Sequence, residues 1–132
     1  MYMPEILRST HTTWMQIVGL ALIAASLLVF GWARNAIKGE YSGRLRVQVG
    51  HILIQHGPYR IVRHPAYASY IIMCLGIAIG FSSLIGLLAV PLLLVPGLIY
   101  RINVEEEILH AEFGEQYVCY RRITKRLIPF IW

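Results

Sequence analysis

Two long stretches of uncharged, mostly apolar residues dominate the pattern of the chain. Residues 14–33 form a stretch of 20 residues, and residues 66–100 form another of 35. A helix needs about 20 apolar residues to cross the hydrocarbon core of a bilayer. The first stretch therefore predicts a membrane-spanning helix. A signal peptide fits less well, because its shorter apolar region follows a basic segment, whereas only Arg8 precedes this stretch.

The second stretch is too long for one crossing, since a straight helix of that length would measure about 52 Å. The segment 80–83, Gly-Phe-Ser-Ser, lies at its midpoint. We therefore expect two short spans, residues 66–81 and 83–100, joined by a tight turn. Pro91 and Pro96 should bend the second of these helices without ending it. The pattern predicts an all-α integral membrane protein with about three transmembrane helices, the last two a tight hairpin, and a cytoplasmic helical extension.

Composition agrees with a membrane protein and excludes other classes. The chain is 57% hydrophobic and 14% charged, whereas an ordinary soluble domain carries roughly 25% charged residues. This apolar content excludes disorder, and two cysteines are too few for a disulfide scaffold. The cysteines lack metal-ligand spacing, so we expect no metal site. A length of 132 residues predicts one membrane-embedded domain over residues 1–132.

The basic residues predict how the spans are oriented. Twelve Lys and Arg against seven Glu give a formal net charge of +5. In a chain this apolar, the surplus of positive charge indicates the positive-inside rule of membrane proteins. We therefore expect no nucleic-acid partner. Six basic residues lie between the first two spans, five follow the third, and the turn has none. This places the N-terminus outside and the C-terminus in the cytoplasm. Gly76 and Gly80 allow another helix to approach closely, and a homo-oligomer is left open.

A first polar cluster, residues 51–67, ends at the start of the second span. It holds His, Tyr and Arg residues in a density that interfacial anchoring alone does not require. Gly57 and Pro58 mark a turn. Pro65 suits the first turn of a helix, where its missing N–H is no loss. His64 is therefore expected at the helix N-terminus, beside free backbone donors, and Tyr67 should point back toward the same end.

A second polar cluster, residues 101–109, directly follows the third span. If the helix continues, Arg101 and Glu105 are four residues apart and can pair. At least one of the three adjacent glutamates, residues 105–107, should turn toward the bundle, where it needs a cationic partner. A carboxylate there would suit a cationic or amine-bearing ligand. The extension should carry an apolar stripe and be interrupted at Gly114; the stripe consists of Ile108, Leu109 and Phe113.

Together these clusters resemble the isoprenylcysteine carboxyl methyltransferase family, whose wider group includes the phospholipid methyltransferases. The matching segments are H-x-L-[IV]-x-x-G-P-Y at 51–59, R-H-P-x-Y at 63–67, R-x-x-x-E-E at 101–106 and F-G-x-x-Y-x-x-Y at 113–120. The resemblance covers residues 44–132. The order and distance of the segments make it specific, although R-H-P-x-Y alone also occurs in related membrane steroid reductases.

The resemblance implies a methyltransferase that binds S-adenosylmethionine at the cytoplasmic end of the last two spans, with residues 101–132 completing the site. Glu105 would meet the amino group of the cofactor, with Glu106 beside it. Arg101 would face the methyl acceptor, so the resemblance assigns the catalytic roles to Arg101 and Glu105. The other residues that would line the cofactor site are His51, Ile52, Leu53, Ile54, Tyr59, His64, Pro65, Ala66 and Tyr67.

Two features depart from the family pattern. Ser69 stands where the family often has Gly. The added hydroxymethyl group would narrow the approach of a ligand to the site. Relatives commonly have further spans before the motifs, where one is expected here, and those spans would help to form the tunnel for the acceptor.

The acceptor and the reaction leave several alternatives open. A carboxylate acceptor needs no general base, whereas an amine would need His64 or a glutamate to remove a proton, so carboxyl transfer is slightly favoured. The acceptor is either a prenylated molecule or another lipophilic small molecule reached through the bilayer. The alternatives are a phospholipid or other small-molecule N-methyltransferase, a non-catalytic membrane subunit and a nicotinamide-dependent membrane reductase.

Overall fold

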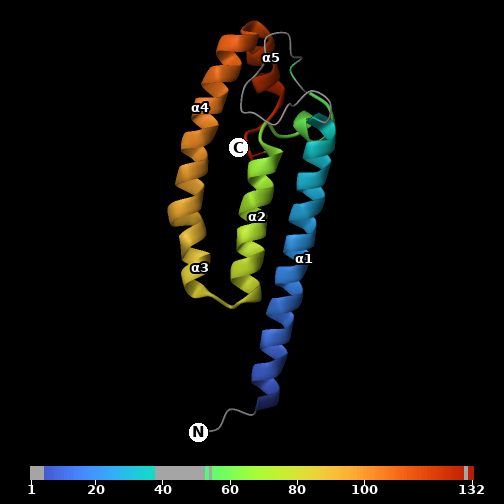
Figure 1. The fold of residues 1–132 in the computed structure, drawn as a ribbon, viewed down its shortest axis with the longest axis vertical. Coiled ribbons are helices and arrows are strands. Elements are labelled where there is room, and N and C mark those ends of the chain that lie inside the picture. Colours follow the sequence, from blue (N-terminus) through green and yellow to red (C-terminus); the bar gives the residue numbers. More distant parts are fainter. Residues whose placement is uncertain (1–4, 38–52, 54, 130) are drawn as a thin grey trace.

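The computed structural model describes residues 5–37, 53, 55–129 and 131–132, with side chains from residue 13 onward. In this part of the chain the protein is mostly helical, and no strand is formed beyond an isolated parallel bridge between Val62 and Lys125. The helices are α1 (Glu5–Ile37), the 3-10 turn η1 (Gly57–Arg60), α2 (Pro65–Gly80), α3 (Leu84–Ala89), the π-helical turn η2 (Val90–Leu94), α4 (Val95–Phe113) and α5 (Glu115–Ile123) (Figure 1).

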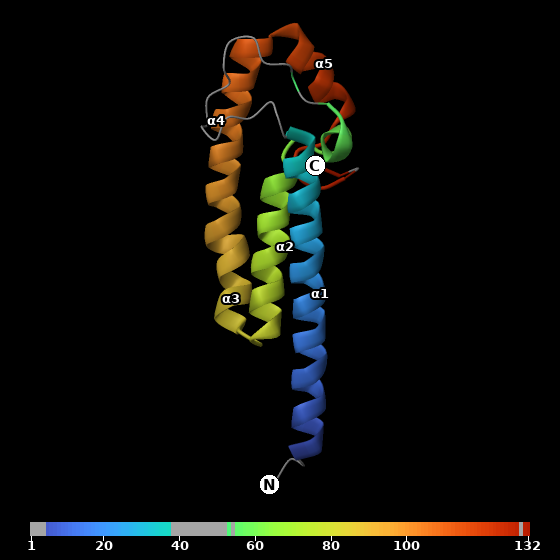
Figure 2. The same cartoon turned by 45° about the vertical axis from the view of Figure 1, so that its right-hand side comes forward.

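Helices α1 and α2 pack side by side over the length of α2 (Figures 1 and 2). Their closest approach is at glycines. A Cβ placed on Gly19 of α1 would lie 2.6 Å from the carbonyl oxygen of Gly76 and 2.7 Å from the Cα of Gly80. The predicted pair of small residues on α2 is therefore used within the chain, against α1.

The chain reverses direction between Gly80 and Leu84, at the predicted turn (Figure 1). Ser82 has a positive φ of 52° there. The hydroxyl of Ser83 caps α3 by accepting a 3.0 Å hydrogen bond from the Gly86 N–H. Beyond the turn, α3, η2 and α4 follow one another without a break. The π-helical turn contains Pro91, whose missing N–H interrupts the regular hydrogen-bond ladder without ending the helix.

Two helical segments, Thr13–Ile37 and Leu84–Phe113, are long and apolar enough to cross a membrane by length and composition. The apolar helix Pro65–Gly80 is shorter. Large apolar side chains on the long segments are exposed, including Leu20 at 67% and Leu93 at 74%. Extensive exposed apolar surface of this kind indicates contact with lipid or with another protein.

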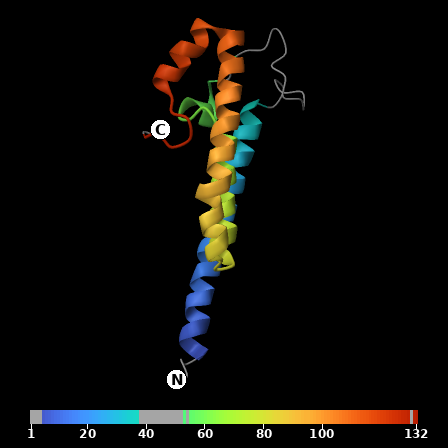
Figure 3. The same ribbon diagram turned by 90° about the vertical axis from the view of Figure 1, so that its left-hand side faces the viewer.

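Gly114 separates α4 from α5 and adopts φ 55°, ψ −123°, a conformation that residues with a Cβ rarely reach. Because of this break, α5 folds back toward the start of α2 (Figure 3). Its Tyr117 and Tyr120 form a small core with Leu53, against which Leu109 and Phe113 of α4 pack.

The predicted apolar stripe on the extension is only partly correct. Leu109 and Phe113 lie on one face because they are four residues apart. Ile108 is one residue earlier, about 100° around the helix from Leu109, and remains 48% exposed.

The segment after α5 runs beside the residues that precede α2. The N–H of Arg63 donates a 2.7 Å hydrogen bond to the carbonyl of Lys125, and the N–H of His64 donates to the carbonyl of Arg126 at 3.1 Å. In return, the N–H of Lys125 donates to the carbonyl of Ile61 at 3.2 Å. These bonds hold the end of the chain at the level where the apolar part of α2 begins.

Candidate functional site

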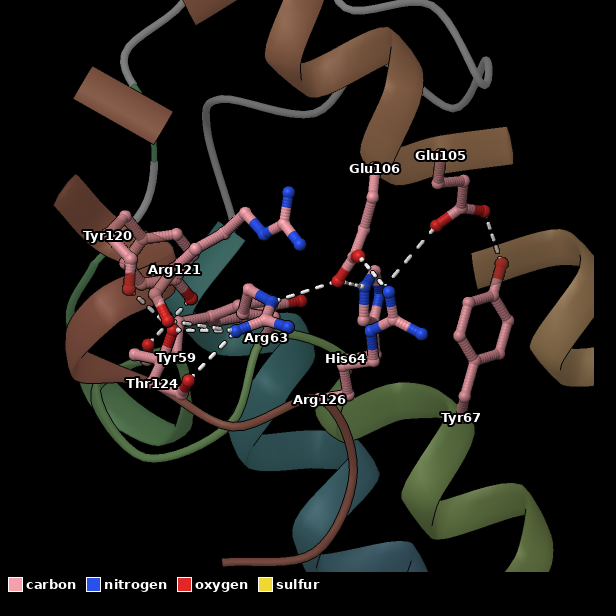
Figure 4. Close-up of polar contacts among 10 residues, drawn as sticks. All are labelled: Tyr59, Arg63, His64, Tyr67, Glu105, Glu106, Tyr120, Arg121, Thr124 and Arg126. Carbon is pink, nitrogen blue, oxygen red and sulfur yellow. Dashed lines mark hydrogen bonds and ion pairs between the residues drawn. The ribbon is translucent and has the colours of Figure 1, made fainter. Parts of the chain in front are cut away.

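The polar residues of the two clusters meet where α2 begins and α4 leaves the apolar stretch (Figure 4). His64 is the N-cap residue of α2, and Pro65 follows in its first turn, as the sequence predicts. In the same turn, the N–H groups of Ala66 and Tyr67 have no intrahelical acceptor. The start of α2 therefore presents backbone donors next to the side chains of α4.

Glu106 of α4 points inward and is only 5% exposed. Its Oε1 accepts a 2.8 Å hydrogen bond from Nε of Arg63 and lies 3.2 Å from Nε2 of His64. Its Oε2 forms an ion pair with Arg126 at 3.1 Å. This confirms the prediction that one of the three glutamates turns toward the bundle and meets a cationic partner. Two guanidinium groups compensate the charge, which a buried carboxylate requires.

Arg63 connects this carboxylate to the end of α5. Its side chain is 7% exposed, and its Nη1 donates hydrogen bonds to the carbonyl of Thr124 at 2.8 Å and to that of Arg121 at 3.3 Å. The guanidinium therefore has acceptors on both sides. The segments before α2, on α4 and after α5 are joined through this one side chain (Figure 4).

Glu105 lies at the open edge of the same cluster, with 28% of its side chain exposed. The hydroxyl of Tyr67 donates a hydrogen bond to its Oε1. Nε of Arg101 lies 3.6 Å from the same oxygen, which confirms the expected pairing, and Nδ1 of His64 lies 3.9 Å from Oε2. Glu105 is thus the carboxylate of the pair that solvent or a ligand can reach.

Aromatic rings and a guanidinium surround Glu105. The rings of His64 and Tyr67 stack with centroids 5.8 Å apart. The guanidinium carbon of Arg101 lies 6.0 Å from the centroid of the Tyr67 ring, and the Arg101 side chain is 52% exposed. This edge therefore offers a carboxylate and an aromatic face for a cation, and an accessible guanidinium for an anion.

Tyrosines of α5 back the cluster. Tyr117 is fully buried, and its burial together with the negative charge of Glu106 raises its pKa to about 12, although Arg63 and Arg121 act in the opposite direction. Burial also raises the pKa of Tyr120, whose hydroxyl donates a 2.7 Å hydrogen bond to the carbonyl of Tyr59. Both tyrosines are neutral at physiological pH, so the negative charge of the cluster comes from the glutamates.

The remaining residues predicted to line the site have different positions. Leu53 is buried at 7% exposure in the core with Tyr117, and Pro65 is less than 2% exposed. Ala66 and Tyr59 are partly exposed. The contacts of these four residues with a ligand stay predictions. Three further residues predicted to line the site lie outside the described part of the chain: His51, Ile52 and Ile54.

The sequence did not reveal the partners of Glu106. Arg63 stood in a recognised motif without a role, and Arg126 was only one of several basic residues near the end of the chain. The one signal was general, namely that a glutamate turned into the bundle needs a cation.

Comparison with known proteins places this arrangement in a family. The phospholipid methyltransferase family model matches residues 14–116. A probable protein-S-isoprenylcysteine O-methyltransferase from Oryza sativa subsp. indica is 33% identical over 88 residues, covering 67% of this chain and 46% of that protein. Protein-S-isoprenylcysteine O-methyltransferase A from Arabidopsis thaliana is 29% identical over 118 residues, covering 89% of this chain and 57% of that protein.

The fold is also similar to that of a solved structure, the eukaryotic intramembrane Ras methyltransferase named isoprenylcysteine carboxyl methyltransferase. The TM-score is 0.80 at 26% sequence identity, and the match covers 89% of this chain and 43% of the other. The chain thus spans about half the length of the relatives that it matches. From its motifs, its fold and the matched residues, the chain belongs to the phospholipid methyltransferase family and is grouped with the isoprenylcysteine carboxyl methyltransferases in it.

Proposed function

We propose that this chain binds S-adenosylmethionine and transfers its methyl group to the carboxylate of a lipophilic, prenylated acceptor at the cytoplasmic face of a membrane. The observation that carries the proposal is the environment of Glu105. Its carboxylate is held by Tyr67, faces Arg101 and stands beside the start of α2, in a chain of a methyltransferase family. The names of the relatives support the acceptor, since they act on isoprenylcysteine.

The membrane placement follows from the apolar helices and the basic residues. In this proposal α1, α2 and the rod α3–α4 are three spans of one membrane domain, with the last two as a hairpin. The exposed apolar side chains of α1 and α3 support contact with lipid. The basic residues between α1 and α2 and after α4 support a cytoplasmic site and an outside N-terminus.

The residues present fit the proposed cofactor. A carboxylate at 28% exposure beside an aromatic ring suits a ligand that carries an ammonium and a sulfonium. The N–H groups of Ala66 and Tyr67 at the start of α2 suit a ligand carboxylate. Bound S-adenosylmethionine would supply the methyl group. Glu106 holds Arg63, Arg126 and His64 together behind this edge, so its role is to position the residues that face the ligand.

Arg101 is placed to orient the acceptor. Its guanidinium is half-exposed at the edge of the site, and a planar guanidinium can bind a carboxylate with two parallel hydrogen bonds. A carboxylate is already ionised at neutral pH, so the chain needs to supply orientation and exclusion of water only. Correct orientation can lower the barrier of such a transfer by up to ~7–11 kcal/mol.

His64 is poorly placed to deprotonate an amine acceptor. It is 5% exposed, and both of its ring nitrogens face glutamate oxygens, at 3.2 Å and 3.9 Å. This arrangement argues against His64 as the base for an amine acceptor and leaves Glu105, at 28% exposure, as the other candidate for that role.

Titration calorimetry of S-adenosylmethionine into the detergent-purified protein tests the cofactor site. We expect saturable binding that is lost in Glu105→Gln and retained in Glu107→Gln, because Glu107 is an exposed neighbour on the same helix. Equal affinity of the wild type and Glu105→Gln would contradict the assignment of the site. Absence of binding to a folded wild type would contradict the cofactor.

The acceptor side is tested by methyl transfer to a prenylated cysteine with a free carboxylate, with an amine-headed phospholipid as the alternative acceptor. Arg101→Ala should bind S-adenosylmethionine as the wild type does but lose transfer to the carboxylate. If only the amine of the phospholipid is methylated, the proposed carboxylate acceptor is wrong and the protein is an N-methyltransferase.

A further inference from the structure

Exposed basic and apolar side chains lie on the segment that follows α5, at the end of α5 and on η1, and the proposed reaction does not use them. The basic members are Arg60, Arg122 and Lys125, which are exposed. The apolar members are Ile123, Ile128, Ile131 and Trp132, which are 73%, 48%, 74% and 40% exposed. We call these basic and apolar residues together the interfacial patch.

The three basic residues differ from the arginines that contact the glutamates of the site. Arg63, Arg101 and Arg126 form ion pairs with glutamates. Among the residues that the structure describes, Arg60, Arg122 and Lys125 form no ion pair. Three cations without anionic partners therefore accompany an exposed apolar surface.

The patch lies at the level where the apolar helices end. Lys125 and Arg126 are hydrogen-bonded to the backbone of residues 61–64, immediately before the apolar helix α2 begins at Pro65. Figure 3 shows the C-terminal segment beside η1. Trp32 of α1 is in the same region, since a Cβ on Gly57 would lie 3.4 Å from its indole nitrogen.

The path of the chain explains why the segment returns to this level. Residues 101–113 of α4 rise beyond the apolar stretch by about 20 Å at 1.5 Å per residue. The break at Gly114 turns α5, which is about 13 Å long, back toward the start of α2, and the hydrogen bonds of Lys125 and Arg126 to residues 61–64 hold the following segment there. The segment is thereby brought down to the membrane boundary while the end of α4 stays above it.

We propose that the interfacial patch binds the anionic phospholipids of the leaflet next to the site, with its cations on headgroup phosphates and its apolar side chains in the interface. Basic residues attract an anionic leaflet, and Trp and aliphatic side chains next to them favour the boundary between headgroups and acyl chains. The inference rests on the membrane placement proposed above but not on methyl transfer. Because Arg126 belongs to the same segment, the bound lipid would also hold a partner of Glu106 in place.

Bromine quenching of single tryptophans tests the proposal in reconstituted bilayers. Trp14→Phe with Trp32→Phe leaves Trp132 as the reporter of the patch. Trp32→Phe with Trp132→Phe leaves Trp14, which is 67% exposed near the other end of the apolar part of α1. Each protein is placed in the same mixture of phosphatidylcholine and phosphatidylglycerol, with bromine on the acyl chains of either one lipid or the other.

We expect Trp132 to be quenched more by brominated phosphatidylglycerol than by brominated phosphatidylcholine, and Trp14 to be quenched equally by both. Each cation in contact with a headgroup should favour the anionic lipid by roughly fivefold. The preference should disappear in Arg60→Gln/Arg122→Gln/Lys125→Gln and weaken in high salt. The same three substitutions are also made in the protein that keeps Trp14 as its single tryptophan. Quenching of Trp14 there shows that the substituted protein is still inserted in the bilayer.

The other outcomes would overturn the proposal in distinct ways. If Trp132 is unquenched while Trp14 is quenched, the patch does not reach the bilayer. If both lipids quench Trp132 equally, the patch does not select anionic lipid. If Trp14 itself is unquenched, the membrane placement of the chain is wrong, and this inference is wrong with it.

Discussion

At the scale of single residues, two adjacent glutamates have different tasks because they face different surroundings. Glu106 is buried and its oxygens are engaged by Arg63, His64 and Arg126. Glu105 is one residue earlier, so it points to the open edge of the cluster and keeps contact with Tyr67 and solvent. Their position on one helix decides which carboxylate holds the fold and which can meet a ligand.

Replacing Glu106 should destabilise the protein more than any other single glutamine substitution in the 105–107 run. Glu106→Gln leaves the buried Arg63 guanidinium without its carboxylate, which costs about 3 kcal/mol or more. Thermal unfolding in detergent measures this loss. Glu107→Gln, an exposed neighbour, is the control and should unfold like the wild type; equal unfolding temperatures of both variants would contradict the structural role of Glu106.

The sequence could predict part of this residue-level arrangement. The Arg101–Glu105 pair follows from helical spacing, and an inward glutamate follows from the position of the run beside an apolar span. The choice of Arg63 and Arg126 as partners could not be predicted. It depends on the turn at Gly114 and on the return of the chain beside residues 61–64, which are features of the tertiary fold.

At the scale of helices, the contact between α1 and α2 depends on the absence of side chains at Gly19 and Gly76. Each glycine would place a Cβ within 3 Å of a backbone oxygen of the other helix. The sequence indicated the small residues on α2. It could not predict that Gly19 is their partner, because a single glycine in an apolar helix forms no recognisable spacing motif.

Gly19→Ala should therefore separate the two helices and destabilise the protein by about 1–3 kcal/mol. Gly31→Ala on the same helix is the matched control, since nothing lies within 4 Å of a Cβ at that position. Resistance to unfolding by denaturing detergent compares the two. A Gly19→Ala protein as resistant as Gly31→Ala would show that α1 and α2 do not approach at this point.

The predicted helix boundaries were close at the turn and less accurate at the ends. Residues 66–81 and 83–100 correspond to α2 and to the rod that begins at Leu84. Helix α1 extends from Glu5 to Ile37, beyond the uncharged stretch 14–33, because the hydrogen-bond ladder of a helix continues into polar sequence. The π-helical turn at Pro91 was predicted only as a bend, since the sequence does not show how the ladder adjusts to a proline.

At the scale of the whole molecule, apolar side chains cover the outside of the long helices. Leu20 is 67% exposed and Leu28 is 75% exposed, although both lie in the apolar stretch of α1. In a soluble protein these side chains would be covered by other elements. Their exposure supports the bilayer as the surroundings of this region.

A charge on this outer surface should oppose insertion of α1. Leu20→Arg is expected to disfavour the membrane-inserted state by about 3 kcal/mol, roughly a hundredfold in the ratio of inserted to non-inserted helix. Glycosylation mapping of α1 during translation into microsomes measures this ratio. Leu20→Ala, which removes the same side chain without adding charge, is the control, and an unchanged ratio in Leu20→Arg would argue against α1 as a span.

The three partners of Glu106 also imply an order of assembly during synthesis. Arg63 and His64 precede Glu106 in the chain, so they can meet it as soon as α4 packs beside α2. Arg126 is made later and reaches the carboxylate only after α5 has turned back. We therefore expect a nascent protein to insert and pair its helices first, and to close its charged cluster only after α5 and Arg126 have left the ribosome.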